Sequence, residues 1–165
     1  MQELYFNDNF FSSGTTDIMN STGDRIGTMD LKTMFSASIS VYGKEGELRS
    51  TGRFRSFSNK WEVANTPEGT EGVLRKRFTF FQKVYEYESP STGMLLIESP
   101  AFSRAYTIKS SGGQLVASFE QTNHWLQSGA FVLQNHSEKL DSYELISIIM
   151  GVHSIHKRAR NTAAQ

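Results

Sequence analysis

The sequence predicts a mainly β protein in which a closed antiparallel β-barrel surrounds a central, hydrophobic C-terminal α-helix. Three observations lead to this fold class. The chain ends in one long apolar stretch with helical character, residues 140–155. The chain before it repeats a unit of strand, polar turn and strand. Twelve Phe, six Tyr and two Trp accompany only three Pro in 165 residues, a composition that favours β-structure.

The C-terminal stretch LDSYELISIIMGVHSIHKRAR is typical of a buried helix. A surface helix has one apolar face, whereas this one carries large aliphatic side chains on nearly every side. Ser147, Gly151 and His153 interrupt the apolar run, so a membrane span is not predicted. The residues expected to anchor the helix inside the barrel are Leu145, Ile146, Ile149 and Val152.

Both ends of this helix are marked in the sequence. Asp141 is the expected N-cap, and Glu144 three residues later fits a capping box. Basic residues at 157, 158 and 160 suit the negative end of the helix dipole. We therefore expect the helix at about residues 141–158.

The preceding chain is expected to form many short strands. The first strand is predicted at residues 3–12. Three further single strands are predicted at residues 60–64, 73–81 and 130–134. Four hairpins with loops of three to five residues are predicted between them. Their strands span residues 18–19 and 25–31, 39–42 and 47–57, 85–88 and 94–98, and 106–109 and 114–121.

A sheet of short antiparallel strands avoids exposed edges by closing on itself. Residues 3–136 supply roughly eleven to sixteen strands at the usual spacing. An eight-stranded barrel has room only for side chains, so this wider one can hold a helix about 10 Å across. Since the sequence contains no linker, residues 1–165 are expected to form a single domain.

This pattern of hairpins followed by an apolar helix resembles the tubby C-terminal-like superfamily. Within that superfamily, the length of the chain is most similar to that of the small LURP-one-related proteins. The resemblance lies in the hairpins of residues 18–29, 41–52 and 107–118 and in the helix of residues 143–155. It implies a closed antiparallel barrel of about twelve strands around the helix. It also implies binding or membrane tethering rather than catalysis. Tubby proteins bind phosphoinositides, but their binding residues have no match at positions in this sequence.

Composition and motifs narrow the functional classes. Seventeen basic and seventeen acidic residues give zero net charge, which does not suit general nucleic-acid binding. Without cysteine there are no disulfides or cysteine-ligated metals, and we expect no cofactor. The sequence lacks the common nucleophile, phosphate-loop and zinc motifs of enzymes. His153 and His156 share a helix face but lack a third ligand, which favours a structural role over a metal site.

The start of the sequence, MQELYFNDNFF, has neither the basic residues nor the apolar run of a signal peptide. We therefore expect a cytoplasmic protein, either free or peripheral at a membrane.

Two pairs of arginines are the candidate binding residues. Arg53 and Arg55 lie two apart on one predicted strand, and Arg75 and Arg77 on another, so each pair shares a face. Guanidinium groups bind phosphate, which suggests an anionic lipid headgroup. The simpler interpretation is a charged outer wall balanced by glutamates. Those glutamates would be Glu47, Glu62 and Glu71.

On the opposite face of the second strand, Leu74, Phe78 and Phe80 are expected in the core. Eleven phenylalanines in all could pack the core around the helix or line a ligand cavity, and packing is the commoner role. They are residues 10, 11, 35, 54, 57, 78, 80, 81, 102, 119 and 131.

The leading hypothesis is a non-catalytic binding module for an anionic phospholipid headgroup or a protein partner. The alternative is a carrier barrel for a small apolar ligand. A carrier needs an empty interior, whereas an all-round apolar helix would fill it.

Overall fold

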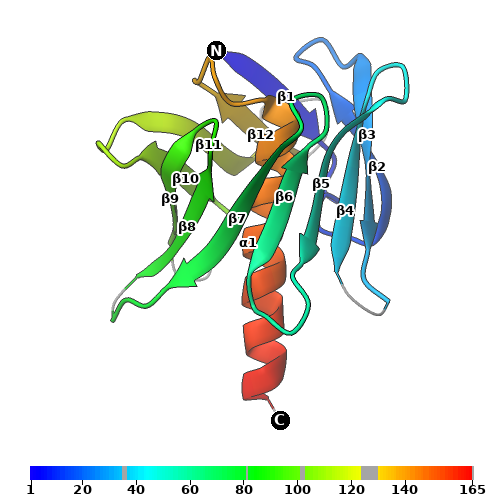
Figure 1. Ribbon diagram of the computed structural model, residues 1–165. Coiled ribbons are helices and arrows are strands. Elements are labelled where there is room, and N and C mark those ends of the chain that lie inside the picture. Colours follow the sequence, from blue (N-terminus) through cyan, green and yellow to red (C-terminus); the bar gives the residue numbers. More distant parts are fainter. Residues whose placement is uncertain (35–36, 81, 101–102, 124–129, 165) are drawn as a thin grey trace.

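The computed structural model describes residues 1–164 apart from residues 35–36, 81, 101–102 and 124–129. It contains twelve strands and one helix (Figure 1). The helix α1 is Ser142–Ala163. The strands are β1 Gln2–Phe6, β2 Gly14–Met19, β3 Arg25–Lys32, β4 Ser38–Gly43, β5 Leu48–Phe54, β6 Trp61–Asn65, β7 Thr70–Arg77, β8 Lys83–Ser89, β9 Gly93–Ser99, β10 Tyr106–Ser110, β11 Leu115–Thr122 and β12 Ala130–Asn135.

Every strand pairs antiparallel with its neighbours in the chain, and β1 pairs with β12 to close the barrel. The closing register runs from Gln2 opposite Asn135 to Phe6 opposite Phe131. The predicted closed antiparallel barrel of about twelve strands with a C-terminal helix is therefore confirmed. Closure leaves none of the twelve strands as a free edge.

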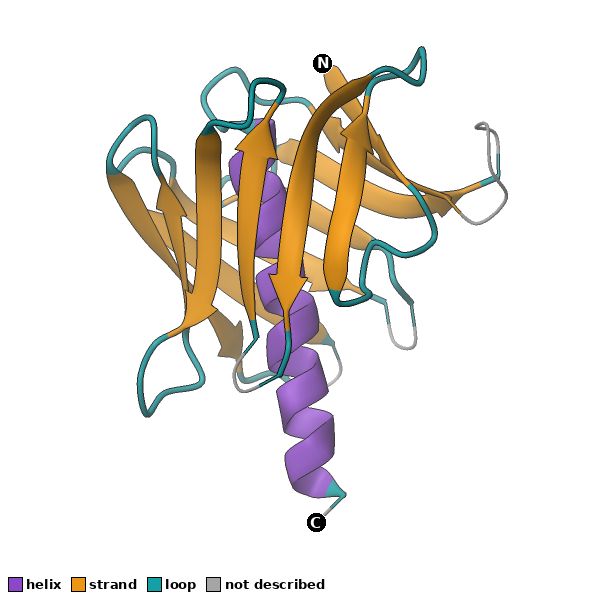
Figure 2. Ribbon diagram, turned by 90° about the vertical axis from the view of Figure 1, so that its right-hand side faces the viewer, coloured by secondary structure: helices purple, strands orange, loops and turns teal. Residues whose placement is uncertain are grey.

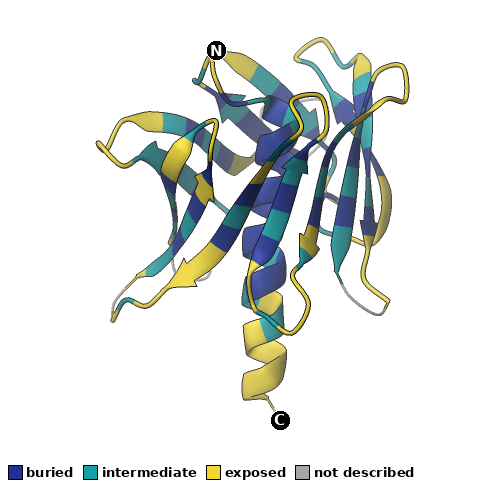
Figure 3. Ribbon diagram, in the orientation of Figure 1, coloured by how far each residue is buried: buried dark blue, intermediate teal, exposed yellow. Residues whose placement is uncertain are grey.

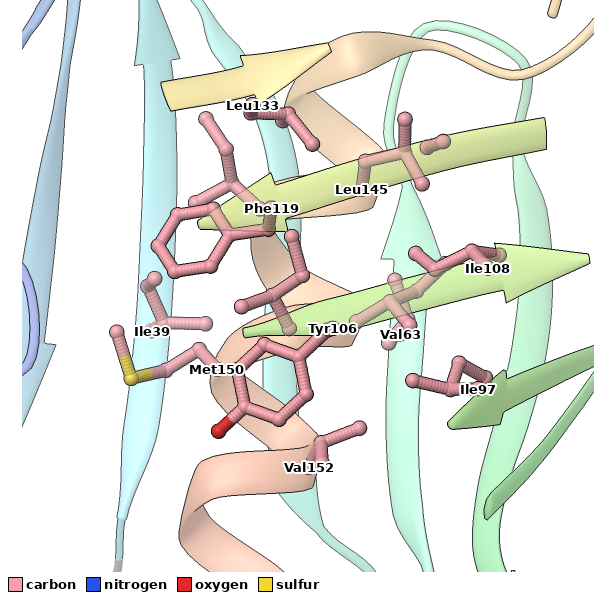
Figure 4. Packing of buried hydrophobic residues seen from close by; sticks show 14 of the residues in the cluster. Ile39, Val63, Ile97, Tyr106, Ile108, Phe119, Leu133, Leu145, Met150 and Val152 are labelled. Atoms are coloured by element: carbon pink, nitrogen blue, oxygen red, sulfur yellow. The ribbon is translucent and has the colours of Figure 1, made fainter. Parts of the chain in front are cut away.

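Helix α1 runs through the barrel, and its buried residues extend from Ser142 to Ile155 (Figure 2). Leu145, Ile146, Ile149 and Val152 are at most 1 % exposed, so the predicted helix core is confirmed. Aliphatic and aromatic side chains from the strands, among them Ile39, Ile108 and Phe119, lie around Leu145 and Val152 (Figure 4). Along the helix, burial gives way to exposure after residue 155 (Figure 3). None of the helices within the described part of the chain could cross a membrane.

Buried polar contacts fix the register of the helix against the wall. Asp141 caps the helix as predicted, accepting a hydrogen bond from the Tyr143 backbone N–H. The Ser147 hydroxyl bonds the Ser50 hydroxyl at 2.8 Å, and its carbonyl accepts from the Trp61 indole N–H at 3.1 Å. Because unsatisfied buried groups are costly, these bonds favour one rotation of the helix.

The predicted capping box at Glu144 is wrong. Its carboxylate instead points into the barrel, where it accepts hydrogen bonds from the Tyr87 hydroxyl at 2.6 Å and the Asn65 amide at 2.9 Å. Side chains from β6 and β8 thus satisfy a carboxylate that is only 2 % exposed. A sequence motif gives the spacing for a cap but does not show which partners the barrel wall supplies.

Some predicted boundaries are also wrong. The first strand ends at Phe6 rather than at residue 12, because Asn7 to Asn9 begin a hydrogen-bonded turn. The helix continues to Ala163 rather than ending near residue 158. The strand predicted at 47–57 ends at Phe54, and the one at 73–81 ends at Arg77.

The phenylalanines divide into three groups. Phe10, Phe119 and Phe131 are buried in the core as predicted, and Phe11 and Phe54 are partly buried against it. The prediction is wrong for three others, because they lie in loops beyond the strand ends: Phe57, Phe78 and Phe80 are exposed. Phe35, Phe81 and Phe102 lie outside the described residues.

Candidate functional site

The up-and-down topology sorts the loops onto two rims. We call the rim at which α1 begins the N-rim, and the rim at which α1 leaves the barrel the C-rim (Figure 1). The loops after the even-numbered strands lie at the N-rim, and those after the odd-numbered strands lie at the C-rim. Loops far apart in the sequence therefore meet at one end.

The two rims differ in charge although the net charge is zero. Acidic residues dominate the N-rim loops, which hold Asp24, Lys44, Glu45, Glu47, Glu68, Glu138, Lys139 and Asp141. Basic residues dominate the C-rim loops and the projecting end of α1, which hold Asp8, Arg55, Lys60, Arg104, Lys157, Arg158 and Arg160. The positive C-rim is the end that suits an anionic ligand.

A pocket of about 530 Å³ lies at the C-rim between α1, β8 and β10. Its cationic side chains come from the start of β8, the β9–β10 loop and the end of α1: Lys83, Arg104 and Arg160. His153 and His156 also line it, and none of its described lining residues is Asp or Glu. Arg104 and Arg160 form no salt bridge with another described residue. Positive charge thus converges here without a lining carboxylate.

Two tyrosines add neutral hydrogen-bonding groups to the pocket. Tyr85 is 1 % exposed and Tyr106 is 6 % exposed, yet neither hydroxyl bonds another residue in the described part of the chain. Burial raises the pKa of both phenols, so they stay protonated. Each can therefore donate a hydrogen bond to an anion in the pocket.

The two histidines are held in their neutral forms by their surroundings. Burial, with Lys157, Arg104 and His156 nearby, lowers the pKa of His153 to about 4. Burial and the cations Lys83, Arg160 and Lys76 also lower the pKa of His156. His153 stacks on Phe11 with ring centroids 4.3 Å apart, which suits the predicted structural role. A bound anion would oppose these shifts and favour protonation.

None of the four predicted arginines lines this pocket: Arg53, Arg75 and Arg77 lie on the outer wall, and Arg55 lies in the loop just beyond β5. Arg53 and Arg55 both pair with Glu62, at 3.7 and 2.7 Å. Arg75 and Arg77 both pair with Glu86, at 3.0 and 3.4 Å. Each pair thus keeps a surplus positive charge, and β6 lies between β5 and β7 as expected. Their role in headgroup binding stays a prediction.

The glutamates that balance the wall are only partly the predicted ones. Glu62 has the expected role, whereas Glu47 lies 3.8 Å from Arg49 and Glu71 has no salt bridge to another described residue. Glu86 was missed because it lies on β8, and only the pairing of β8 with β7 places it opposite Arg75. No group of three or more potential metal ligands occurs among the described residues.

Sequence reasoning missed the pocket for a topological reason. Its cations stand at positions 83, 104 and 160, with no spacing that links them. The sequence contains one signal, the basic end of α1 beside two histidines, but basic residues at a helix C-terminus are already explained by the helix dipole. Only barrel closure brings the β9–β10 loop beside that helix end.

Comparison with known proteins supports the fold alone. No protein-family model and no curated protein matches the chain. It is similar to the X-ray structure of the Arabidopsis thaliana protein AT5G01750, with a TM-score of 0.58 and 10 % sequence identity. The match covers 94 % of this chain and 91 % of that one.

Proposed function

We propose that this protein is a non-catalytic module that binds a phosphate-bearing anionic lipid headgroup in the C-rim pocket. The observation that carries the proposal is the convergence of Lys83, Arg104 and Arg160 on one cavity that no described Asp or Glu lines. Charged donors bind phosphate oxygens more strongly than neutral ones, and arginine can do so with two parallel hydrogen bonds.

The size and polarity of the pocket also favour such a ligand. A volume of about 530 Å³ falls within the usual range for small-molecule sites. The Tyr85 and Tyr106 hydroxyls would supply neutral donors deeper in the cavity. Several cations around one cavity suit more than one phosphate, as in a multiply phosphorylated headgroup.

The two alternatives have less support. A carrier barrel needs interior space, which α1 occupies with side chains such as Leu145 and Ile149 that are 0 % exposed. A protein partner would leave the convergence of cations around a concave site without a role. An enzyme would need a base hydrogen-bonded to a nucleophile or to an orienting group, and neither pocket histidine forms a hydrogen bond with another described residue.

We further propose that the chain belongs to the tubby C-terminal-like superfamily, near the small LURP-one-related proteins. The support is the twelve-stranded closed barrel with its central C-terminal helix. On this proposal the protein is cytoplasmic and associates peripherally with a membrane.

The test is calorimetric titration with inositol trisphosphate, a soluble multiply phosphorylated headgroup, with inorganic phosphate titrated separately. The variant Arg104→Gln, Arg160→Gln should weaken binding of inositol trisphosphate at least about tenfold, because it removes two charged donors. The control Lys44→Gln, Lys139→Gln makes the same charge change at the N-rim and should bind as wild type. Equal weakening by both variants, or no binding by wild type, would rule out the pocket. Equal affinity for inorganic phosphate would identify free phosphate as the ligand.

A further inference from the structure

We infer that the C-rim docks on an anionic phospholipid bilayer and inserts aromatic loop tips into it. This inference rests on the proposed function, because the headgroup bound in the pocket would belong to the same membrane. It adds a second, apolar attachment at residues that the pocket does not contain.

Among the described residues, the most exposed large apolar side chains apart from the N-terminal Met1 lie on three C-rim loops. They are Met34 at 86 %, Phe57 at 111 %, Phe78 at 85 % and Phe80 at 84 % exposed. At the N-rim, Leu48, Met94 and Leu115 reach only 37 to 44 %. Phenylalanine is seldom left this exposed without a reason, and several together mark an interaction surface.

These side chains lie on one arc of the rim. Phe57 is in the β5–β6 loop and Phe78 and Phe80 are in the β7–β8 loop, and β5 to β8 are consecutive in the sheet. Met34 belongs to the adjoining β3–β4 loop. In Figure 1 these loops lie at the lower end of the barrel, with the β7–β8 loop at the left, the β5–β6 loop in the centre and the β3–β4 loop at the right. Figure 3 shows the described loop tips as exposed.

Local contacts hold the aromatic tips outward. Arg158 from α1 donates to the Ser58 carbonyl at 3.1 Å and lies 3.4 Å from the Phe54 ring centroid, which ties the β5–β6 loop to the helix. In the β7–β8 loop the Phe78 and Phe80 rings meet edge to face, 5.4 Å apart. Presentation by a held loop lowers the entropy that insertion would cost.

Charge complementarity identifies the partner as an anionic membrane. The basic end of α1 lies at the same rim. The pair Arg53 and Arg55 at the end of β5 and the pair Arg75 and Arg77 at the end of β7 lie next to the aromatic loops with surplus positive charge. The aromatic side chains suit the apolar interior of a bilayer, and the basic side chains next to them suit its anionic headgroups. A protein partner with an acidic apolar face is the competing outcome.

The projecting end of α1 sets the orientation. It extends past the loops (Figure 2), and its last turns carry Lys157, Arg158 and Arg160. The barrel therefore docks tilted toward the β5–β8 arc. Basic side chains of the helix end then lie among headgroups while the aromatic tips reach the acyl boundary.

The test is vesicle sedimentation with phosphatidylcholine vesicles that contain or lack phosphatidylinositol bisphosphate. Phe57→Ser, Phe78→Ser, Phe80→Ser should bind the anionic vesicles at least about tenfold more weakly than wild type, because three rings no longer leave water. The matched control, Leu48→Ser, Met94→Ser, Leu115→Ser, makes similar changes at the N-rim and should bind as wild type. High salt should weaken vesicle binding by the wild type without abolishing it. The binding that persists at high salt should be absent in the phenylalanine variant.

Insertion depth supplies a second readout. Because the chain has no cysteine, Phe57→Cys and Leu115→Cys each give one site for a nitroxide label. The label at 57 should become shielded from aqueous relaxation agents on anionic vesicles, and the label at 115 should not.

The outcomes separate the two proposals. If the phenylalanine variant binds vesicles as wild type does, or the label at 57 stays in water, insertion is overturned while headgroup binding stands. If wild type binds inositol trisphosphate but no vesicles, docking is overturned and a free headgroup is the ligand. If the phenylalanine variant also loses inositol trisphosphate binding, the aromatic loops belong to the pocket and not to a membrane anchor.

Discussion

Gly151 marks the closest approach of the helix to the barrel wall. A Cβ built at this position would lie 2.4 Å from the Trp61 ring and 2.8 Å from Leu74. The same indole lies 2.6 Å from a Cβ built at Gly52 on β5. Trp61 thus fits between two glycines, one on the helix and one on the wall. What interrupts the apolar run in the sequence is a packing site for a tryptophan in the structure.

Gly151→Ala is therefore expected to destabilise the protein, although alanine is the better helix former. The added methyl group must displace a buried indole, and overpacking of this kind costs about 1–3 kcal/mol. Urea unfolding measures the free energy of unfolding. Thr162→Ala, at an exposed site of the same helix, is the control and should be neutral or slightly stabilising. A stability gain in Gly151→Ala would mean that α1 does not pack on Trp61.

The buried side chain of His153 is expected to make the stability of the protein depend on pH. Its pKa is 6.5 when exposed and about 4 in the fold, so the unfolded chain takes up a proton first as pH falls. The contribution of neutral His153 to the free energy of unfolding is fully present above pH 6.5 and is lost as the pH falls toward 4. Between pH 7 and pH 5 the loss should be about 1–2 kcal/mol.

The measurement compares unfolding free energies at pH 7 and pH 5 for wild type and His153→Gln. The variant should lose about 1–2 kcal/mol less than wild type over this interval, because glutamine does not titrate. His136→Gln in an exposed N-rim loop should retain the wild-type dependence. An unchanged pH dependence in His153→Gln would place the relevant titration at another group.

At the scale of elements, hairpins and helix could be predicted because their signals are local. Turn glycines such as Gly23 and Gly113 take positive φ values of 86° and 83°, which glycine favours, and the sequence shows them directly. The ends of β5 and β7 had no such marker. Aromatic residues continue past Phe54 and Arg77, and only pairing with the next strand determines where the barrel stops.

The candidate site was less predictable than the fold. The arginine pairs could be found because residues two apart on a strand share a face. The pairing of Arg75 and Arg77 with Glu86 depends on contacts between neighbouring strands, and the pocket depends on contacts between the strands and the helix. Residues 83, 104 and 160 acquire a common role only after the barrel closes.

We expect the barrel to fold only with its central helix in place, and a substitution of Ile149 tests this expectation. Ile149 is 0 % exposed, so Ile149→Asp would bury a charge without a partner at a cost of several kcal/mol. The variant should unfold at much lower urea or fail to fold. Asn161→Asp introduces the same side chain at an exposed position of α1 and should behave as wild type. Similar melting temperatures for both variants would place the helix outside the barrel.

At the scale of the whole molecule, zero net charge conceals two rims of opposite character. The acidic N-rim would repel an anionic surface while the basic C-rim attracts it, so the charge distribution orients the protein as well as binding it. The same rim holds the pocket and the exposed phenylalanines. Binding in the wild type should therefore be directional and sensitive to salt.

The most direct measurement is a map of backbone amide chemical shifts during titration of the 18.6 kDa protein with inositol trisphosphate. We predict saturable shifts around the C-rim pocket, at Lys83, Tyr85, Tyr106 and His156, with the N-rim loops unchanged. Saturable shifts centred on Arg53, Arg55, Arg75 and Arg77 would move the site to the outer wall. Shifts at the N-rim, or none that saturate, would contradict the account of the C-rim as the binding end.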